Sequence, residues 1–154
     1  MQPKSANHIL KAFSKRAEEK IFKPGELLAS KDFLSSHVFL IIEGTARLLS
    51  VTGTKESSIH RLSSGDLVGA CSFLQGISIE HVRAASDLKV LSLPDHKFLE
   101  LLIKDSEFRN IFLSELFPAE VLQIAQLADL QETANNFDLK DCFQKLGKLS
   151  LIHI

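Results

Sequence analysis

The feature that most constrains the fold is a series of short apolar runs, separated by turn residues, between Lys20 and Leu93. A parallel sheet would need helical crossovers between its strands, and the spacing leaves no room for them. The pattern therefore predicts about eight strands in an antiparallel sandwich or jelly-roll barrel. The turn signals are Pro24-Gly25, Ser35-Ser36, Gly44, Thr52-Gly53, Ser63-Ser64-Gly65-Asp66, Gly76 and Ser86-Asp87.

Helical periodicity flanks this β-rich segment. Apolar residues at helical spacing predict a short amphipathic helix over residues 6–19. After Pro94, the segment "PDHKFLELLIKD" places Phe98, Leu101 and Leu102 on one helical face. "SEFRNIFLSELF" follows with Ser106 as its expected cap, and "PAEVLQIAQLADLQ" and "DLKDCFQKLGKL" continue the helical pattern.

We therefore expect a mainly β chain with flanking helices, an α+β organisation in four parts. The closing "LSLIHI" alternates like a strand but has no following partner, which favours a fragment of a longer chain. The alternative is a terminal strand that pairs back onto the β-rich part. The four parts are an N-terminal helix (1–20), a β-roll (21–93), post-roll hinge or lid helices (94–117) and a helical extension ending at the start of a further β-element (118–154).

Composition limits the classes of function. The formal net charge of −1 gives no overall attraction to nucleic-acid phosphates, and a chain with eleven Phe has no Tyr or Trp for base stacking. Cys71 and Cys142 form no disulfide framework, which indicates a reducing compartment. No apolar run approaches the roughly 18 residues that span a bilayer. We expect a cytoplasmic domain without membrane contact of its own, whose parent chain could sit at the inner membrane.

Charge is nevertheless distributed unevenly along the chain. Residues 1–23 contain six basic side chains against two acidic ones, whereas residues 105–141 contain eight acidic side chains against two basic ones. Solvated helix faces would explain this distribution. The alternative is that the two ends attract each other, or a partner, electrostatically.

Four segments, "FKPGELLA", "HVFLIIEGTARLL", "LSSGDLVGACSFL" and "VRAASDLKVLSLPDHKFLELL", together resemble the cyclic-nucleotide-binding domain family over roughly residues 9–110. The resemblance rests on glycines that stand where the family turns tightly between strands. The chain departs from the family pattern at Lys31, which precedes Asp32 and stands where the family usually has glycine. The resemblance implies a β-roll of jelly-roll type. The matching glycines are Gly25, Gly44, Gly65 and Gly69.

The resemblance also implies a phosphate-binding cassette, which here reads "GACSFLQGISIEHVRAAS". In the family a Glu after the first Gly holds the ribose, backbone amides of a short helix receive the phosphate, and an Arg pairs with it. Ala70 stands at the ribose carboxylate position and Ser78 at the arginine position, followed by Ile79. A register shifted by two residues places Glu80 there instead. Arg83, the nearby cation, lies about five residues beyond the arginine position of the family.

Losing both charged groups would remove roughly 3–6 kcal/mol of binding free energy, which is about two to four orders of magnitude in affinity. We therefore predict that the domain does not bind cAMP or cGMP. An altered pocket in which Arg83 receives the phosphate is the alternative. The candidate residues of this degenerate cassette are Gly69, Ala70, Cys71, Ser72, Ser78, Ile79, Glu80, His81 and Arg83, and the expected lid contacts are Phe98, Leu101 and Leu102.

Other chemistry has little support. His37, His60, His81 and His96 occur singly, without the clustered ligands of a metal site or of a cupin-like enzyme, so we expect no cofactor. Cys71 is interpreted as a small core residue rather than a nucleophile with His81 as base. The pair Glu80-His81 could titrate near neutrality, which makes a pH-sensing role a hypothesis.

We expect a non-catalytic regulatory or scaffolding module. Residues 116–146 loosely resemble the region after such a domain in bacterial peptidase-containing ABC exporters, which suggests a parent transport protein. The alternative is the sensor half of a bacterial transcription regulator, although the acidic tail lacks a basic recognition helix and predicts no nucleic-acid binding. Expected partners are other domains of the same chain, a homo-oligomer partner or an unknown small effector.

Overall fold

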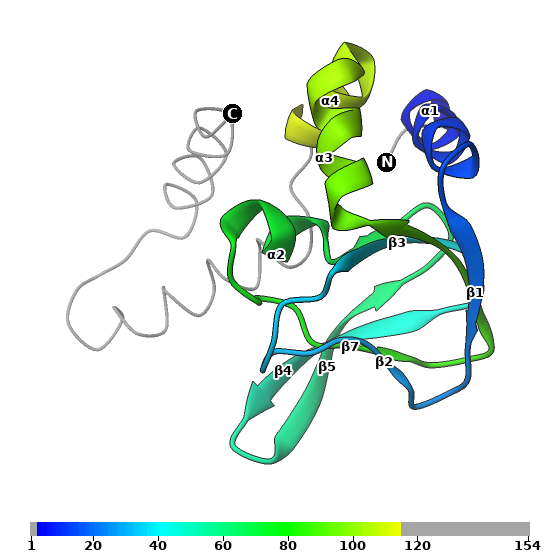
Figure 1. Cartoon of the computed structure of the whole chain (residues 1–154). Helices are drawn as coiled ribbons and strands as arrows, with labels where there is room; N and C mark the ends of the chain where they lie inside the picture. The colour runs from blue at the N-terminus through cyan, green and yellow to red at the C-terminus, as the bar shows by residue number, and fades with distance from the viewer. Residues whose placement is uncertain (1–2, 115–154) are drawn as a thin grey trace.

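The computed structural model describes residues 3–114, in which two antiparallel sheets of four strands each form the body of the molecule. Figure 1 shows the two sheets facing each other below a group of helices. The prediction of an antiparallel jelly-roll fold is confirmed. In spatial order the first sheet contains β1 (Glu18–Phe22), β8 (Leu88–Pro94), β3 (His37–Glu43) and β6 (Leu67–Val68), and the second contains β2 (Leu27–Ala29), β7 (Val82–Ala84), β4 (Ala46–Thr52) and β5 (Lys55–Leu62).

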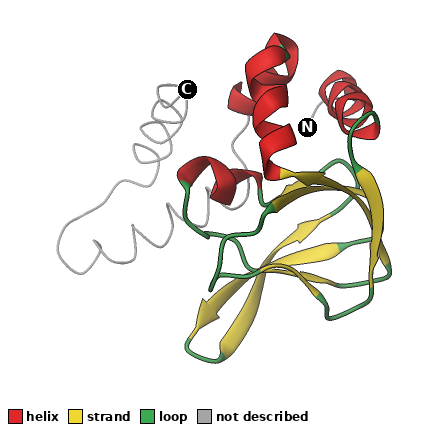
Figure 2. Ribbon diagram, in the orientation of Figure 1, coloured by secondary structure: helices red, strands yellow, loops and turns green. Residues whose placement is uncertain are grey.

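Four helices complete the described part of the chain, namely α1 (Pro3–Ser14), α2 (Ala70–Gln75), α3 (Asp95–Lys104) and α4 (Ser106–Ser114). Of these, α1, α3 and α4 lie together at one end of the sheets (Figure 2). Phe98 of α3 is fully buried at their centre, with ring centroids 5.5–6.4 Å from those of four other phenylalanines. The partners are Phe13, Phe73, Phe108 and Phe112.

The first helix is shorter than the sequence predicts, because it ends at Ser14 rather than near residue 19. The carbonyl of Phe13 accepts hydrogen bonds from the amides of both Arg16 and Ala17, at 3.0 and 2.8 Å, which closes the helix. Glu18 then begins β1 by pairing with Ser92 of β8. Pairing with a strand distant in sequence therefore overrides the local helical pattern.

The start of α4 also differs from the sequence prediction. The amide of Phe108 donates to Asp105 Oδ1 at 2.9 Å, so Asp105 caps the helix instead of Ser106. The same carboxylate lies 3.0 Å from Nε2 of His8 on α1. One aspartate thus caps α4 and joins it to α1.

The predicted helical face of Phe98, Leu101 and Leu102 is confirmed, because all three side chains are buried. None of the helices between residues 3 and 114 is long and apolar enough to cross a membrane. The expected extension at 118–154, the closing "LSLIHI" and Cys142 lie outside the described residues.

Candidate functional site

The cassette lies between β6 and β7, where the chain forms the single short helix α2 (Figure 1). Gly69 precedes the helix with a φ of 92°, and a Cβ there would lie 3.1 Å from the carbonyl oxygen of His37. Gly76 follows with a φ of 73°, and its amide donates to Ser72 and Phe73. Glycine is favoured at both ends, since other residues rarely adopt this left-handed conformation.

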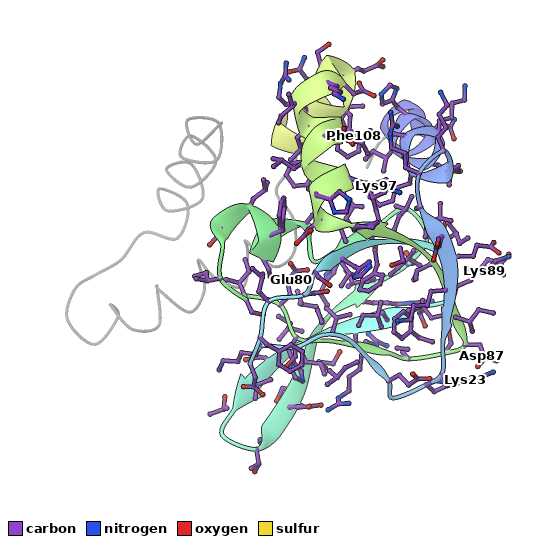
Figure 3. All side chains as sticks on the ribbon, viewed as in Figure 1. Lys23, Glu80, Asp87, Lys89, Lys97 and Phe108 are labelled. Carbon is purple, nitrogen blue, oxygen red and sulfur yellow. The ribbon has the colours of Figure 1, made fainter. Side chains whose placement is uncertain are left out.

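The carboxylate of Glu80 occupies the donors at the start of α2. Its Oε2 accepts the amide of Gly69 at 2.8 Å, and its Oε1 accepts the amide of Ser72 at 3.1 Å and the Ser72 hydroxyl at 2.9 Å. Glu80 is only 3% exposed. Figure 3 shows it beside α2. The loop after α2 therefore folds back and places its own anion against the helix.

Burial raises the pKa of Glu80 above its ordinary value, while the hydrogen bonds from Gly69 and Ser72 oppose that rise. Burial dominates because the side chain is almost completely removed from water. The carboxylate is thus held by three donors in a place where its charge is costly.

The remaining cassette residues offer no cation to a ligand. Ala70 and Cys71 are buried, at 2% and 4% exposure, and belong to the hydrophobic core. The Ser78 hydroxyl donates to the carbonyl of Ser30, and the amide of Ile79 donates to Ser72 Oγ at 3.1 Å. These residues and Glu80 form one connected group around α2.

His81 and Arg83 belong to a different group, on the other side of β7. Val82 and Ala84 are buried between the sheets, so the alternation of side chains along the strand turns Arg83 outward. Arg83 donates from Nε and from a terminal nitrogen to Glu56 on β5, each at 2.8 Å, and also to the carbonyl of Gly25 at 2.9 Å. The guanidinium is therefore already engaged.

His81 joins the same outer group. Its Nδ1 accepts the amide of Lys31 at 3.1 Å, which places the ring proton on Nε2, 3.1 Å from Glu56 Oε1. The hydrogen bond from Arg83, followed by that from His81, lowers the pKa of Glu56 to about 2. Glu80 and His81 are adjacent in sequence, but they share no hydrogen-bond partner.

Comparison with known proteins gives the family. A model described as "Cyclic nucleotide-binding domain" matches residues 19–105, more than half of the chain. The chain belongs to the cyclic nucleotide-binding domain family. Domains of this family typically have a regulatory rather than a catalytic role.

Solved structures share the fold of this cyclic nucleotide-binding domain at low sequence identity. The catabolite activator protein of Thermus thermophilus is 20% identical with a TM-score of 0.61, over 86% of this chain and 59% of that one. A transcriptional regulator from Thermotoga maritima is 23% identical with a TM-score of 0.63, over 82% and 98% of the two chains. A regulatory subunit of a cAMP-independent protein kinase A from Trypanosoma brucei is 16% identical with a TM-score of 0.61, over 75% and 42%. That structure is of a mutant with three substitutions, bound to cAMP.

One curated relative is much longer than this chain. Lysophospholipase NTE1 of Meyerozyma guilliermondii is 24% identical over 95 residues, which are 60% of this chain and 7% of the lysophospholipase. The domain therefore occurs as a small part of a large protein in that relative.

Sequence reasoning missed Glu56, the acceptor that engages Arg83 and His81. Glu56 lies 25 residues from His81 and 27 from Arg83 in sequence, and only the order β7-β4-β5 brings the three together. The available signal was the exposed, polar character of residues 55–61, which indicates an edge strand with free side chains. Within residues 3–114, no group of three or more His, Cys, Asp or Glu side chains could hold a metal ion.

Proposed function

We propose that this domain is a non-catalytic regulatory or scaffolding module whose cassette is closed by its own Glu80 and does not take up cAMP or cGMP. The observation that carries the proposal is the set of three hydrogen bonds from Gly69 and Ser72 to the Glu80 carboxylate. In a family member that binds its ligand, amides at the start of this helix are expected to serve the ligand. Here the amides of Gly69 and Ser72 instead bind the carboxylate of the protein's own Glu80.

The electrostatics of the cassette support this proposal. A cyclic phosphate entering at α2 would meet the buried carboxylate of Glu80, and like charges at close range repel. Neither Ala70 nor Ser78 supplies a compensating charge. Arg83 points to the opposite side of β7 and is bound to Glu56, so its transfer to the cassette would first break that ion pair.

The contacts of α2 support a regulatory role for the cassette. Phe73 of α2 lies against Phe98 of α3, with ring centroids 5.8 Å apart. Phe98 in turn contacts Phe108 and Phe112 of α4. A movement of α2 would therefore reach the helices after the β-roll through packed side chains, which is the role proposed here for Phe98, Leu101 and Leu102.

Calorimetric titration with cAMP and with cGMP tests the proposal. The wild-type chain should give no saturable heat at millimolar ligand. Saturable binding at micromolar concentration would overturn it, and an Arg83→Gln variant would then show whether Arg83 is the phosphate partner.

Restoring the missing groups tests the part assigned to Glu80. Ala70→Glu with Ser78→Arg should still bind weakly, because Glu80 continues to occupy the amides. Adding Glu80→Ala should create saturable binding. Equal affinity of the double and triple variants would contradict the role of Glu80, and circular dichroism of each variant would establish that it is folded. The cAMP-bound Trypanosoma brucei mutant, derived from a cAMP-independent subunit, supports the feasibility of such a restoration.

We propose further that the domain is part of a larger protein, with a bacterial ABC exporter as the parent. This part rests on the resemblance of residues 116–146, which lie outside the described residues. The likeness to a catabolite activator protein and a transcriptional regulator favours the sensor half of a transcription regulator as the second candidate. The sequence of the full-length protein separates them. An exporter carries apolar runs of about 20 residues and a Walker motif, and a regulator carries a basic helix-turn-helix.

A further inference from the structure

Three arginines lie side by side on the outer face of the sheet that contains β7, β4 and β5. Arg47 of β4 is directly opposite Arg83 of β7 on one side and Arg61 of β5 on the other. Directly opposite residues of antiparallel strands point to the same face, and neighbouring strands are about 4.8 Å apart. We call Arg47, Arg61 and Arg83 the arginine row; it crosses β7, β4 and β5, the strands labelled in Figure 1.

The arginine row has more positive charge than its surroundings neutralise. Arg47 and Arg61 are exposed, and within residues 3–114 neither has an ion-pair partner. Glu56 binds Arg83 and is the carboxylate that contacts the row. Lys31 adds a further cation at this face, where its amine donates to the carbonyl of Val51. Like charges placed opposite each other weaken a sheet, so the stability of the strands does not explain the exposed Arg47 and Arg61 beside Arg83.

The chain itself contains a segment of complementary charge. Residues 115–139 carry five acidic side chains and no Lys or Arg. Residues 3–114 contain fifteen basic and thirteen acidic side chains, whereas residues 115–154 contain three basic and six acidic ones. The acidic side chains of the segment are Glu115, Glu120, Asp129, Glu132 and Asp138.

The acidic segment is long enough to reach the arginine row. An extended chain covers about 3.3 Å per residue, so 25 residues can span up to about 80 Å. A domain of about 100 residues has a radius of gyration of only about 13 Å. A segment that begins directly after α4 can therefore pass around the body of the molecule to either sheet.

We propose that residues 115–139 dock on the arginine row of the same chain, held by carboxylate–guanidinium pairs. The docked segment would shield the row and hold the residues after α4 against the second sheet. The contact does not involve Glu80 or the donors at the start of α2, so it does not depend on the function proposed for Glu80. The alternative to this contact is that the same segment docks on the basic residues near α1, which include Lys11 and Arg16.

A spin label near the end of the acidic segment tests the proposal. Cys142 lies three residues beyond the segment, while Cys71, the other cysteine, is 4% exposed and should not react under native conditions. A nitroxide on Cys142 of the 154-residue chain should broaden the NMR amide signals of Leu48 and Leu62, next to the arginine row. The double variant Arg47→Gln/Arg61→Gln should abolish this broadening. So should about 1 M salt, where the Debye length is about 3 Å.

The matched control removes the same amount of charge elsewhere. Lys11→Gln/Arg16→Gln should leave the broadening at Leu48 and Leu62 unchanged. Broadening that survives the arginine variant, or that concentrates on α1 and disappears with the control variant, would overturn the proposal. Broadening seen only when spin-labelled and isotope-labelled chains are mixed would assign the row to a second copy and would overturn the same-chain contact. A Cys142→Ser chain treated with the reagent establishes that Cys71 carries no label.

Discussion

At the scale of single residues, Glu80 should make the stability of the domain depend on pH in an unusual direction for a carboxylate. Its pKa in the folded state lies above the ordinary value of 4.5, chiefly because it is buried. The folded state therefore holds the proton more tightly than the unfolded chain does. The resulting stabilisation is complete below about pH 4.5 and is lost as the pH rises through the pKa of the folded state.

The Glu80→Gln variant isolates this contribution, because glutamine does not titrate. As the pH rises from about 4.5, wild type should lose free energy of unfolding relative to Glu80→Gln. Urea denaturation across a pH series measures both curves. Glu100→Gln is the control, since Lys104 lowers the pKa of Glu100 and the relative slope should have the opposite sign. Parallel curves for wild type and Glu80→Gln would show that the pKa of Glu80 is not raised.

Gly44, between β3 and β4, is required for a second reason besides its φ of 92°. A Cβ there would lie 2.2 Å from the backbone carbonyl oxygen of Asp87, whereas Gly25 has nearly the same φ, 89°, and open space around it. Left-handed strain should cost both alanine variants about 1–2 kcal/mol. Gly44→Ala should lose more free energy of unfolding than Gly25→Ala, because the Asp87 backbone must also move. Equal losses by denaturant unfolding would contradict the steric reason.

At the scale of elements, the capping of α4 gives a prediction with a built-in control. Asp105 Oδ1 accepts the amide of Phe108, while Ser106, the cap expected from the sequence, has no such bond. Asp105→Ala should cost about 0.5–2 kcal/mol of stability, and more if the contact with His8 contributes. Ser106→Ala should leave the free energy of unfolding nearly unchanged. A larger loss for Ser106→Ala would restore the sequence-based assignment.

The elements themselves were predictable where their causes are local. Short apolar runs bounded by Gly25, Gly44 and Gly65 predict strands, because glycine is the residue that most readily adopts the positive φ of the turns between them. The end of α1 was not predictable in this way. It depends on the pairing of Glu18 with Ser92, two residues far apart in sequence whose meeting requires the whole first sheet.

At the scale of the whole molecule, the sequence identifies the residues of the segment between β6 and β7 but not the contacts that they make. That Ala70 and Ser78 stand at the carboxylate and arginine positions of the family pattern stays a prediction from the sequence. The contact of Glu80 with Gly69 requires the chain to reverse after α2, and the contact of Arg83 with Glu56 requires β4 to lie between β7 and β5. Both follow from the tertiary arrangement rather than from any local pattern. Glu80 and Glu56 consequently lie on opposite sides of β7: Glu80 is within the molecule and Glu56 is on its outer face.

The outer glutamate, Glu56, should contribute to the sensitivity of the whole molecule to acid. Arg83, as the main cause, and His81 lower the pKa of Glu56 to about 2, so the stabilisation is complete above the ordinary value of 4.5 and is lost as the pH falls toward 2. The advantage of wild type over Glu56→Gln should therefore shrink across this interval, as measured by urea denaturation. Because Glu56 is at the surface, about 1 M salt should reduce the advantage at every pH. Arg83→Gln should reproduce the effect, and combining it with Glu56→Gln should add little, since both remove one interaction. An advantage that stays constant down to pH 2 would show that the ion pair does not contribute to folding.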